Sequence, residues 1–220
     1  MEHTNPDINC NVYCFGWEDN LIKEFNSVYS AKFIPIPVSE KIHADVKNNV
    51  RCGGALELKV KCINDFLITE DSAALWIDAD SLVTGDLGII NSKITDQDYD
   101  VVCTRRKHRT LEHEIFALGV LGFSNSLVSR EFTESFYNKM MTSGGVEGWF
   151  HDQLEFFRTF EEKKPRHYSL RNFEHSLKGV KESIVYSRRE AIEITPNKLA
   201  EILGFPIKSI DSLPDNIYPI

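Results

Sequence analysis

The chain has few cysteines and none of the paired spacings that build small cross-linked domains. Its five cysteines stand at irregular intervals: Cys10, Cys14, Cys52, Cys62 and Cys103. An odd count without a C-x-x-C pair argues against a disulfide framework or a zinc knuckle and favours reduced thiols. There is also no N-x-S/T acceptor site, no charged-then-apolar leader pattern and no apolar run near the ~18 residues of a membrane span. These absences predict a soluble, cytoplasmic protein with no membrane span.

Positive charge is scarce as well. Lysine and arginine number 25 against 33 acidic residues, for a formal net charge of −8. A broad nucleic-acid surface usually needs clustered cations, so we expect no nucleic-acid partner. The length of 220 residues fits one domain with a sizeable core, and 42% apolar content is ordinary for a globular protein.

Strand-like apolar runs alternate with helical patterns along the chain. The predicted strands are Ile8–Phe15, Lys32–Val38, Ala73–Ile77, Val101–Thr104 and Ile115–Phe123, and the predicted helices are Trp17–Ser30, 55–68, Leu127–Met141, Asp152–Glu162 and Lys198–Leu203. Prolines at 35 and 37 suit an edge strand, and the almost wholly apolar Ile115–Phe123 suits a central one. The alternation predicts an α/β domain with a largely parallel sheet.

Two carboxylates separated by one small residue follow a predicted buried strand. Asp78 and Asp80 flank Ala79 directly after Ala73–Ile77, and a Gly85-Asp86 turn comes soon after. In an open α/β sheet, ligands collect at the carboxyl ends of strands. Two neighbouring carboxylates repel each other unless a divalent cation joins them, and such a cation bridges phosphate oxygens. The alternative is that these acids cap a loop or pair with surface lysines.

The segment Trp76-Ile77-Asp78-Ala79-Asp80-Ser81-Leu82-Val83-Thr84-Gly85-Asp86-Leu87 resembles the metal-binding D-x-D signature of GT-A glycosyltransferases, particularly glycosyltransferase family 8. The resemblance implies a GT-A fold, Rossmann-like and mixed but largely parallel, with flanking helices in a single domain over 1–220. It implies a donor half at about 1–100, an acceptor half at about 101–190 and a tail at 191–220. It also implies Mn²⁺ or Mg²⁺, a UDP-sugar donor and a carbohydrate or glycoprotein acceptor.

Further site residues follow from the same resemblance. Family 8 enzymes carry a His-x-x-Gly-x-x-Lys segment, and His175-Ser176-Leu177-Lys178-Gly179-Val180-Lys181 resembles it with the glycine one place late. This likeness implies that His175 joins Asp78 and Asp80 on the metal, and that Lys178 and Lys181 contact the diphosphate. The exit of the first strand at Phe15 and Gly16 would cradle the nucleotide base. A solvated loop is the alternative for the histidine segment.

Lys59 stands out from helical periodicity alone. It falls near the middle of the apolar arc of the helix predicted over 55–68. An unpaired ammonium there would be costly, so we expect it to reach the donor site or an acid of the metal site. The alternative is that the side chain snorkels to the surface.

Asp152 follows a glycine-rich stretch and opens a predicted helix. Its position resembles the acceptor loop of GT-A enzymes, which implies a role as base toward the acceptor hydroxyl. The alternative is a helix N-cap. The basic run at 105–109 either binds an anionic acceptor or the donor diphosphate, or is simply solvated.

Two other functions are compatible with the sequence. A haloacid-dehalogenase-like phosphotransferase also places D-x-D after a strand, with the first aspartate as nucleophile. That class expects Thr or Val where this chain has Leu82, and its motif normally opens the domain. A nucleotide-sugar-binding module without turnover is the third possibility.

Overall fold

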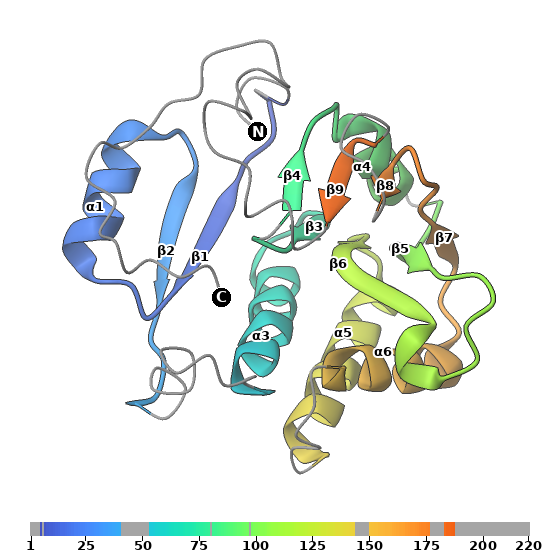
Figure 1. Ribbon diagram of the computed structural model, residues 1–220. Helices are drawn as coiled ribbons and strands as arrows, with labels where there is room; N and C mark the ends of the chain where they lie inside the picture. Colours follow the sequence, from blue (N-terminus) through green and yellow to red (C-terminus); the bar gives the residue numbers. More distant parts are fainter. Residues whose placement is uncertain are drawn as a thin grey trace.

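The structure, a computed structural model, describes residues 5, 7–40, 53–79, 81–96, 98–143, 150–176 and 183–187 (Figure 1). In chain order, the elements are β1 (Asn11–Phe15), α1 (Asp19–Val28), β2 (Lys32–Ile36), α3 (Gly53–Thr69), β3 (Ala74–Ile77), β4 (Ser81–Val83), α4 (Gly88–Thr95), β5 (Val101–Arg105), the 3-10 turn η1 (Glu112–Glu114), β6 (Phe116–Phe123), α5 (Leu127–Thr142), α6 (His151–Lys163), β7 (His167–Ser169), β8 (His175–Ser176) and β9 (Val185–Ser187).

The strands form three small sheets, ordered β1-β2, β3-β6-β5-β7 and β4-β9-β8. The α/β class is confirmed, but the prediction of a largely parallel sheet is wrong for the described strands. Central strand β6 runs antiparallel to both β3 and β5, and β4 runs antiparallel to β9, whereas β1-β2, β5-β7 and β8-β9 are parallel. The physical reason is the short connection from β5 to β6. It holds only a 3-10 turn, whereas a parallel return needs a crossover of roughly a dozen residues or more, usually a helix.

The direction of β6 sets the position of the site. Because β3 and β5 both run against β6, they run in the same direction, and their carboxyl ends lie at the same edge of the sheet. The β5-β6 register shifts between Cys103 and Thr104, which is a bulge close to that edge.

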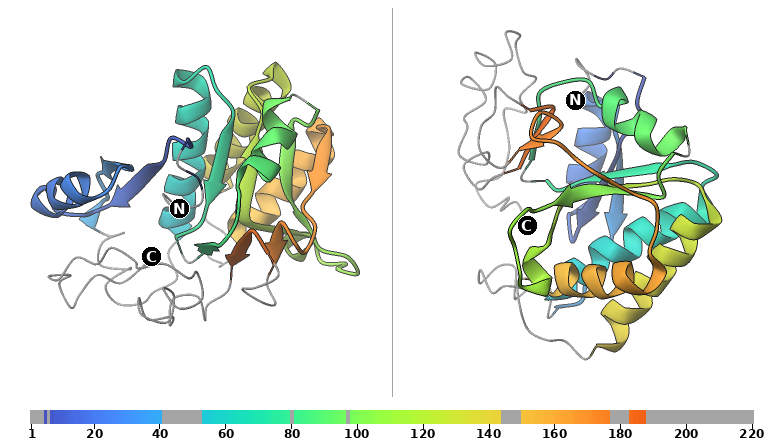
Figure 2. Two further views of the ribbon diagram at one scale, coloured as in Figure 1. Left: turned by 90° about the horizontal axis from the view of Figure 1, so that it is seen from above. Right: turned by 90° about the vertical axis from the view of Figure 1, so that its right-hand side faces the viewer.

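Two apolar clusters cover the two faces of the four-stranded sheet. On one face, α3, α5 and α6 pack against β5 and β6; on the other, α4 packs with β9 and the segment around Leu170 (Figure 2). The first cluster is rich in phenylalanine, with its rings in mutual contact at Phe116, Phe132, Phe136 and Phe156. The helices on this face carry Lys59 and Asp152 to the site.

Most predicted elements are confirmed with small differences in their bounds. The first strand starts three residues later than predicted, at Asn11, and the helix predicted over 55–68 extends from Gly53 to Thr69. Strand β2 pairs with β1 alone among the described strands, as expected for an edge strand, and β6 is central as predicted. The prediction missed α4, η1 and the short strands β4, β7, β8 and β9. The helix predicted over Lys198–Leu203 lies outside the described residues.

The turn after β4 is held by residues far away in sequence. Asn5 donates its side-chain amide to the Gly85 carbonyl (3.0 Å) and accepts from the Leu87 N–H (2.6 Å). Thr84 donates its N–H to the Ile184 carbonyl at 2.8 Å. Residues near both ends of the described chain therefore fix this turn.

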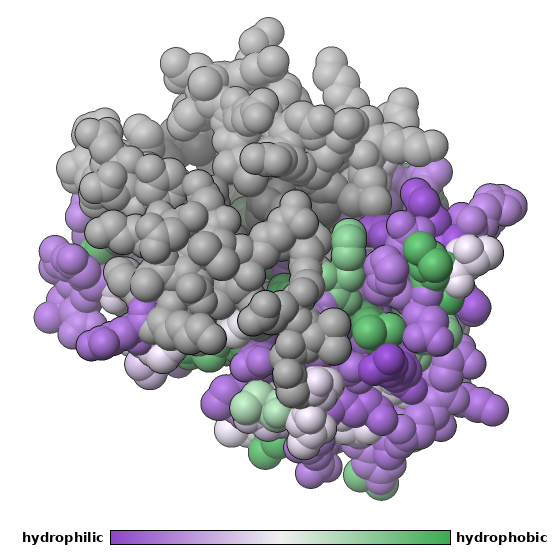
Figure 3. Space-filling model, turned by 60° about the horizontal axis from the view of Figure 1, so that its bottom comes forward, coloured by the Kyte–Doolittle hydropathy of each residue, from purple (hydrophilic) through white to green (hydrophobic). Residues whose placement is uncertain are grey.

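The described part of the face in Figure 3 is mostly hydrophilic, with apolar side chains in small separate groups. Among the described residues, no helix is both long enough and apolar enough to cross a membrane.

Candidate active site

Asp78 lies directly after β3, at the edge of the sheet where β3 and β5 both end. Its backbone N–H donates to the Gly119 carbonyl (2.9 Å) and its carbonyl accepts from the Ser81 N–H (3.0 Å), so the turn is fixed on both sides. The indole Nε1 of Trp76 donates to Asp78 Oδ1 at 2.7 Å. Residues i and i+2 of an extended segment share one face, which brings this indole to the carboxylate. The side chain of Asp78 remains 33% exposed.

Lys59 reaches Asp78 from helix α3. Its Nζ lies 2.9 Å from Asp78 Oδ1 and donates to the Leu118 carbonyl at 2.8 Å. A second carboxylate, Asp152 Oδ2, lies 3.7 Å from the same nitrogen. Lys59 is only 6% exposed, so the snorkelling alternative is wrong and the expected pairing with an acid of the predicted metal site is confirmed. This ammonium joins two carboxylates from different elements, because its own helix packs between β3 and α6.

The contacts of Asp78 with protein groups all fall on one of its two carboxylate oxygens. Oδ1 of Asp78 forms the ion pair with Lys59 and accepts the hydrogen bond from Trp76. Among the described residues, none donates to Oδ2. Any cation bound at Asp78 therefore shares this carboxylate with Lys59.

Asp152 lies in the first turn of α6 and is 4% exposed. Burial raises the pKa of its carboxyl, Asp78 raises it further, and Lys59 opposes both effects. Its Oδ1 accepts from the N–H of the next residue, Gln153, at 2.8 Å. The helix N-cap is Phe150, without a side-chain capping bond, so the N-cap interpretation of Asp152 is wrong. One carboxylate oxygen thus accepts from an amide of the first turn of the helix, and the other faces Lys59.

His175 lies in β8 and is 2% exposed. Its Nδ1 is 2.6 Å from the hydroxyl of Thr104, at the end of β5, and its Nε2 has no hydrogen-bond partner among the described residues. Burial lowers the pKa of the imidazole to about 4; the nearby Asp78 opposes this shift and Arg106 adds to it. A neutral imidazole with one nitrogen anchored and the other unsatisfied is the form that ligates a metal.

The predicted metal site is only partly within the described residues. Asp78 and His175 are described, whereas Asp80 lies outside. Within the described part of the chain, no group of three or more His, Cys, Asp or Glu side chains is arranged to hold a metal. Carboxylate oxygen and imidazole nitrogen are nevertheless donors suited to Mn²⁺, and the buried, unsatisfied Nε2 of His175 fits such a ligand.

The predicted donor contacts fall on both described and undescribed residues. Phe15 ends β1, and Gly16 follows it with φ 69° and donates its N–H to the Ile36 carbonyl at 3.1 Å. The β1 strand lies against β3 through Tyr13, whose ring stacks on Trp76 with centroids 5.9 Å apart. Lys178 and Lys181 lie outside the described residues. Base and diphosphate binding by these four residues stays a prediction.

Three residues of the cluster were not predicted from the sequence. Trp76 has a usable signal, because it stands two positions before Asp78 in a strand. Thr104 and the backbone carbonyl of Leu118 have no such signal in the sequence. Their contacts with His175 and Lys59 depend on which strands and helices lie side by side.

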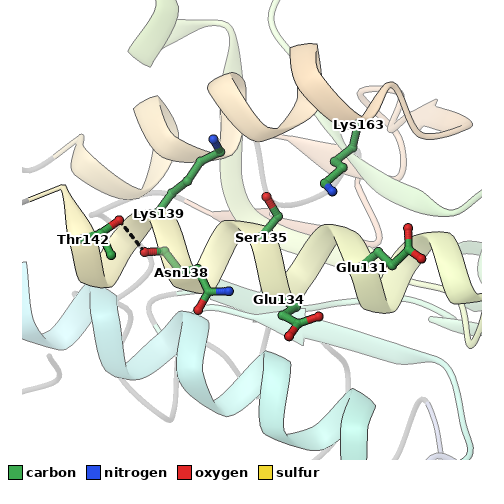
Figure 4. Close-up of a pocket in the computed structure, with 7 residues that line it drawn as sticks. All are labelled: Glu131, Glu134, Ser135, Asn138, Lys139, Thr142 and Lys163. Atoms are coloured by element: carbon green, nitrogen blue, oxygen red, sulfur yellow. Dashed lines mark hydrogen bonds between the residues drawn. The ribbon is translucent and has the colours of Figure 1, made fainter.

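A hollow of about 390 Å³ lies elsewhere, on the outer surfaces of α5 and α6 (Figure 4). Its lining mixes both signs of charge: Glu131, Glu134, Ser135, Asn138, Lys139, Thr142 and Lys163. Lys139 is already paired with Glu162 at 2.7 Å. The hollow contains none of the predicted site residues.

No known family model matches the chain, and no curated protein matches it in sequence. Among solved structures, it is similar to the crystal structure of the apo-form glycosyltransferase GlyE of Streptococcus pneumoniae TIGR4, with 16% sequence identity and a TM-score of 0.43. The match covers 77% of this chain and 46% of that one, so the chain spans about half the length of GlyE. A likeness this loose establishes neither a shared fold nor a shared activity.

Proposed function

We propose that the chain is a metal-dependent glycosyltransferase that moves a sugar from a nucleotide-diphosphate donor, a UDP-sugar, to a carbohydrate or glycoprotein acceptor. The observation that carries the proposal is the cluster of Lys59, Asp78 and Asp152 at the edge where β3 and β5 end, next to a buried His175 with an unsatisfied Nε2. Buried charges of this kind are costly for stability, and they concentrate at functional sites.

Asp78, Asp80 and His175 would hold Mn²⁺ or Mg²⁺. When bound, the cation supplies a Lewis acid for the diphosphate that departs from the sugar. With Nδ1–H donated to the Thr104 hydroxyl, the imidazole of His175 would present the lone pair of Nε2 to the cation. Trp76 fixes Oδ1 of Asp78 through a 2.7 Å hydrogen bond.

Asp152 is the residue we assign to the acceptor. Its carboxylate would take the proton of the acceptor hydroxyl as that oxygen bonds to the sugar carbon and the bond from carbon to the diphosphate oxygen breaks. Burial raises the pKa of Asp152, which makes its carboxylate a stronger base. The positive charge of Lys59 opposes this shift and favours the ionised carboxylate. Lys59 contacts both acids and so fixes the distance between the donor and acceptor sides.

On the donor side, Phe15 and Gly16 would bind the nucleotide base, and Lys178 and Lys181 would bind the diphosphate. The assignment of Phe15 and Gly16 is supported by the position of β1 beside β3, through the Tyr13–Trp76 stack.

Isothermal titration of UDP into the purified chain, with Mn²⁺ or with EDTA, tests the proposal. We expect binding that depends on Mn²⁺ and that falls at least ten-fold in Asp78→Asn. Asp65→Asn is the matched control, because Asp65 is an exposed carboxylate on the surface of α3 that pairs with Lys61. It should bind UDP like the wild type.

A thermal-shift panel of nucleotide sugars with Mn²⁺ then identifies the donor, since a ligand of the folded state stabilises by mass action. With that donor, Asp152→Asn should retain UDP affinity and lose transfer. Equal UDP affinity with and without Mn²⁺, or in Asp78→Asn, would contradict the metal site. No binding of any nucleotide would contradict the proposed function as a whole.

A further inference from the structure

A cationic loop lies next to the candidate site in an otherwise acidic protein. The chain has a net charge of −8, yet five consecutive residues from the end of β5 toward η1, Arg105 to Arg109, are Arg, Lys or His. Four of them are exposed, whereas Arg106 is partly buried. The four exposed side chains are solvated, whereas the charge of Arg106 is partly removed from water.

Arg106 is held against η1 on the acceptor side of the site. Its N–H donates to the Ile115 carbonyl at 2.7 Å, and its guanidinium makes a long hydrogen bond to the Glu114 carbonyl at 3.4 Å. Helix α6 is fixed to the same turn by Gln153. With its amide nitrogen toward η1, Gln153 donates to the His113 and Phe116 carbonyls at 2.8 and 2.7 Å. Gln153 directly follows Asp152, so Arg106 and Asp152 flank one short turn.

The guanidinium lacks a carboxylate partner among the described residues. The nearby Glu114 carboxylate pairs with Arg109 at 3.3 Å, which leaves Arg106 the backbone carbonyl. Burial and Arg109 both lower the pKa of Arg106, although Glu114 opposes them. The charge of Arg106 in turn lowers the pKa of the buried His175. A partly desolvated guanidinium has five N–H donors, and planar anions such as carboxylate and phosphate satisfy them best.

The position of the loop favours the acceptor over the donor. Arg106 follows β5, and β5 is separated from β3 by β6. The end of β1, where we expect the nucleotide base, lies on the other side of β3 (Figures 1 and 2). Asp152, the residue assigned to the acceptor hydroxyl, lies with Arg106 around η1.

We propose that Arg106 forms an anion subsite that binds the carboxylate or phosphate of an acidic acceptor saccharide while Asp152 faces its hydroxyl. The assignment of the bound saccharide as an acceptor rests on the proposed function, but anion binding at Arg106 is testable without donor or metal.

Ligand-observed NMR titration of the metal-free, nucleotide-free chain with three probes tests the subsite: glucuronate, glucose 6-phosphate and neutral glucose. We expect one or both anionic sugars to bind at least ten-fold more tightly than glucose. The preferred anion distinguishes a carboxylate from a phosphate subsite. Arg106→Met should remove the preference and Arg106→Lys should restore part of it. Lys107→Met, which removes one exposed charge from the same loop, should leave it within two-fold.

Each other outcome overturns the subsite. These outcomes are no preference for the anionic sugars, a preference that survives in folded Arg106→Met, and an equal loss in Lys107→Met, which would indicate only a diffuse field. Displacement of the anionic sugar by UDP with Mn²⁺ would reassign Arg106 to the donor diphosphate. Failure of UDP to bind, with anionic-sugar binding intact, would instead contradict the proposed function and leave the subsite standing.

Discussion

Replacing Lys59 by methionine removes the ammonium that joins Asp78 to Asp152 while keeping an apolar stem of similar length in α3. Breaking a fully buried ion pair costs roughly 3–5 kcal/mol, because the remaining charge stays desolvated. Here the Asp78 side chain is 33% exposed and keeps its bond to Trp76, so water and the indole compensate in part. The Leu118 carbonyl also loses its donor. We therefore expect a loss of about 2 kcal/mol in the free energy of unfolding at pH 7.

Urea titration followed by tryptophan fluorescence measures this loss, and thermal unfolding should show a Tm lower by roughly 4–8 °C for a chain of this size. Lys61→Met is the matched control on the same helix. Its ion pair with Asp65 is about half exposed, so the expected change is below about 0.5 kcal/mol. The double variant Lys59→Met/Asp78→Asn should be more stable than the sum of the single changes indicates, by about 1 kcal/mol. Unchanged stability in Lys59→Met, or strict additivity in the double variant, would refute the buried pairing.

Other perturbations give equally specific outcomes. The pKa of His175 is about 4 in the folded state and near 6.5 when unfolded, so the unfolded state binds its proton first as the pH falls. The contribution of His175 to the free energy of unfolding is therefore fully present above about pH 6.5 and is lost as the pH falls to 4, with a ceiling of about 3 kcal/mol. His175→Gln should flatten this part of the stability–pH curve measured by urea unfolding. An unchanged slope would count against burial of the imidazole. In Gly122→Ala the new Cβ would lie 3.1 Å from Val102 Cβ and 3.3 Å from Ile94 Cγ2, which should cost about 1–3 kcal/mol in thermal unfolding; a neutral effect would mean that α4 sits farther from the sheet. Phe156→Ala deletes a fully buried ring and should cost about 3–5 kcal/mol with little change in the urea m-value, whereas a loss below 1 kcal/mol would contradict its place in the core.

Periodicity predicted the longer elements well, because each buries a broad apolar face. Helices α5 and α6 and strand β6 were found within one or two residues of their bounds. The direction of β6 could not be predicted, since its apolar run is compatible with either pairing. The short strands β7, β8 and β9 hold only two or three residues each, too few to show a period.

The candidate site was likewise predictable where a local pattern marks a residue and not where distant elements meet. Helical spacing alone marked Lys59 as a cation on an apolar face, and the structure pairs it with the acid that the sequence motif singled out. Its second acid, Asp152, is 93 positions further along the chain, so only packing of α3 against α6 joins them. The interpretation of Asp152 as a cap was wrong because the helix starts one residue earlier than predicted, which moves its carboxylate inside the first turn.

The turn after β4 is tied by Asn5, 80 positions before Gly85, and by Ser183, whose carbonyl accepts from the Thr84 hydroxyl across 99 positions. Contacts between such distant segments form slowly, because each closes a long loop of chain. A nascent or partly folded chain can therefore build β5, β6 and their helices while this turn is still untied. We expect nucleotide affinity to appear only in the last kinetic phase of refolding, so that a bound ligand reports completion of the fold rather than formation of its core.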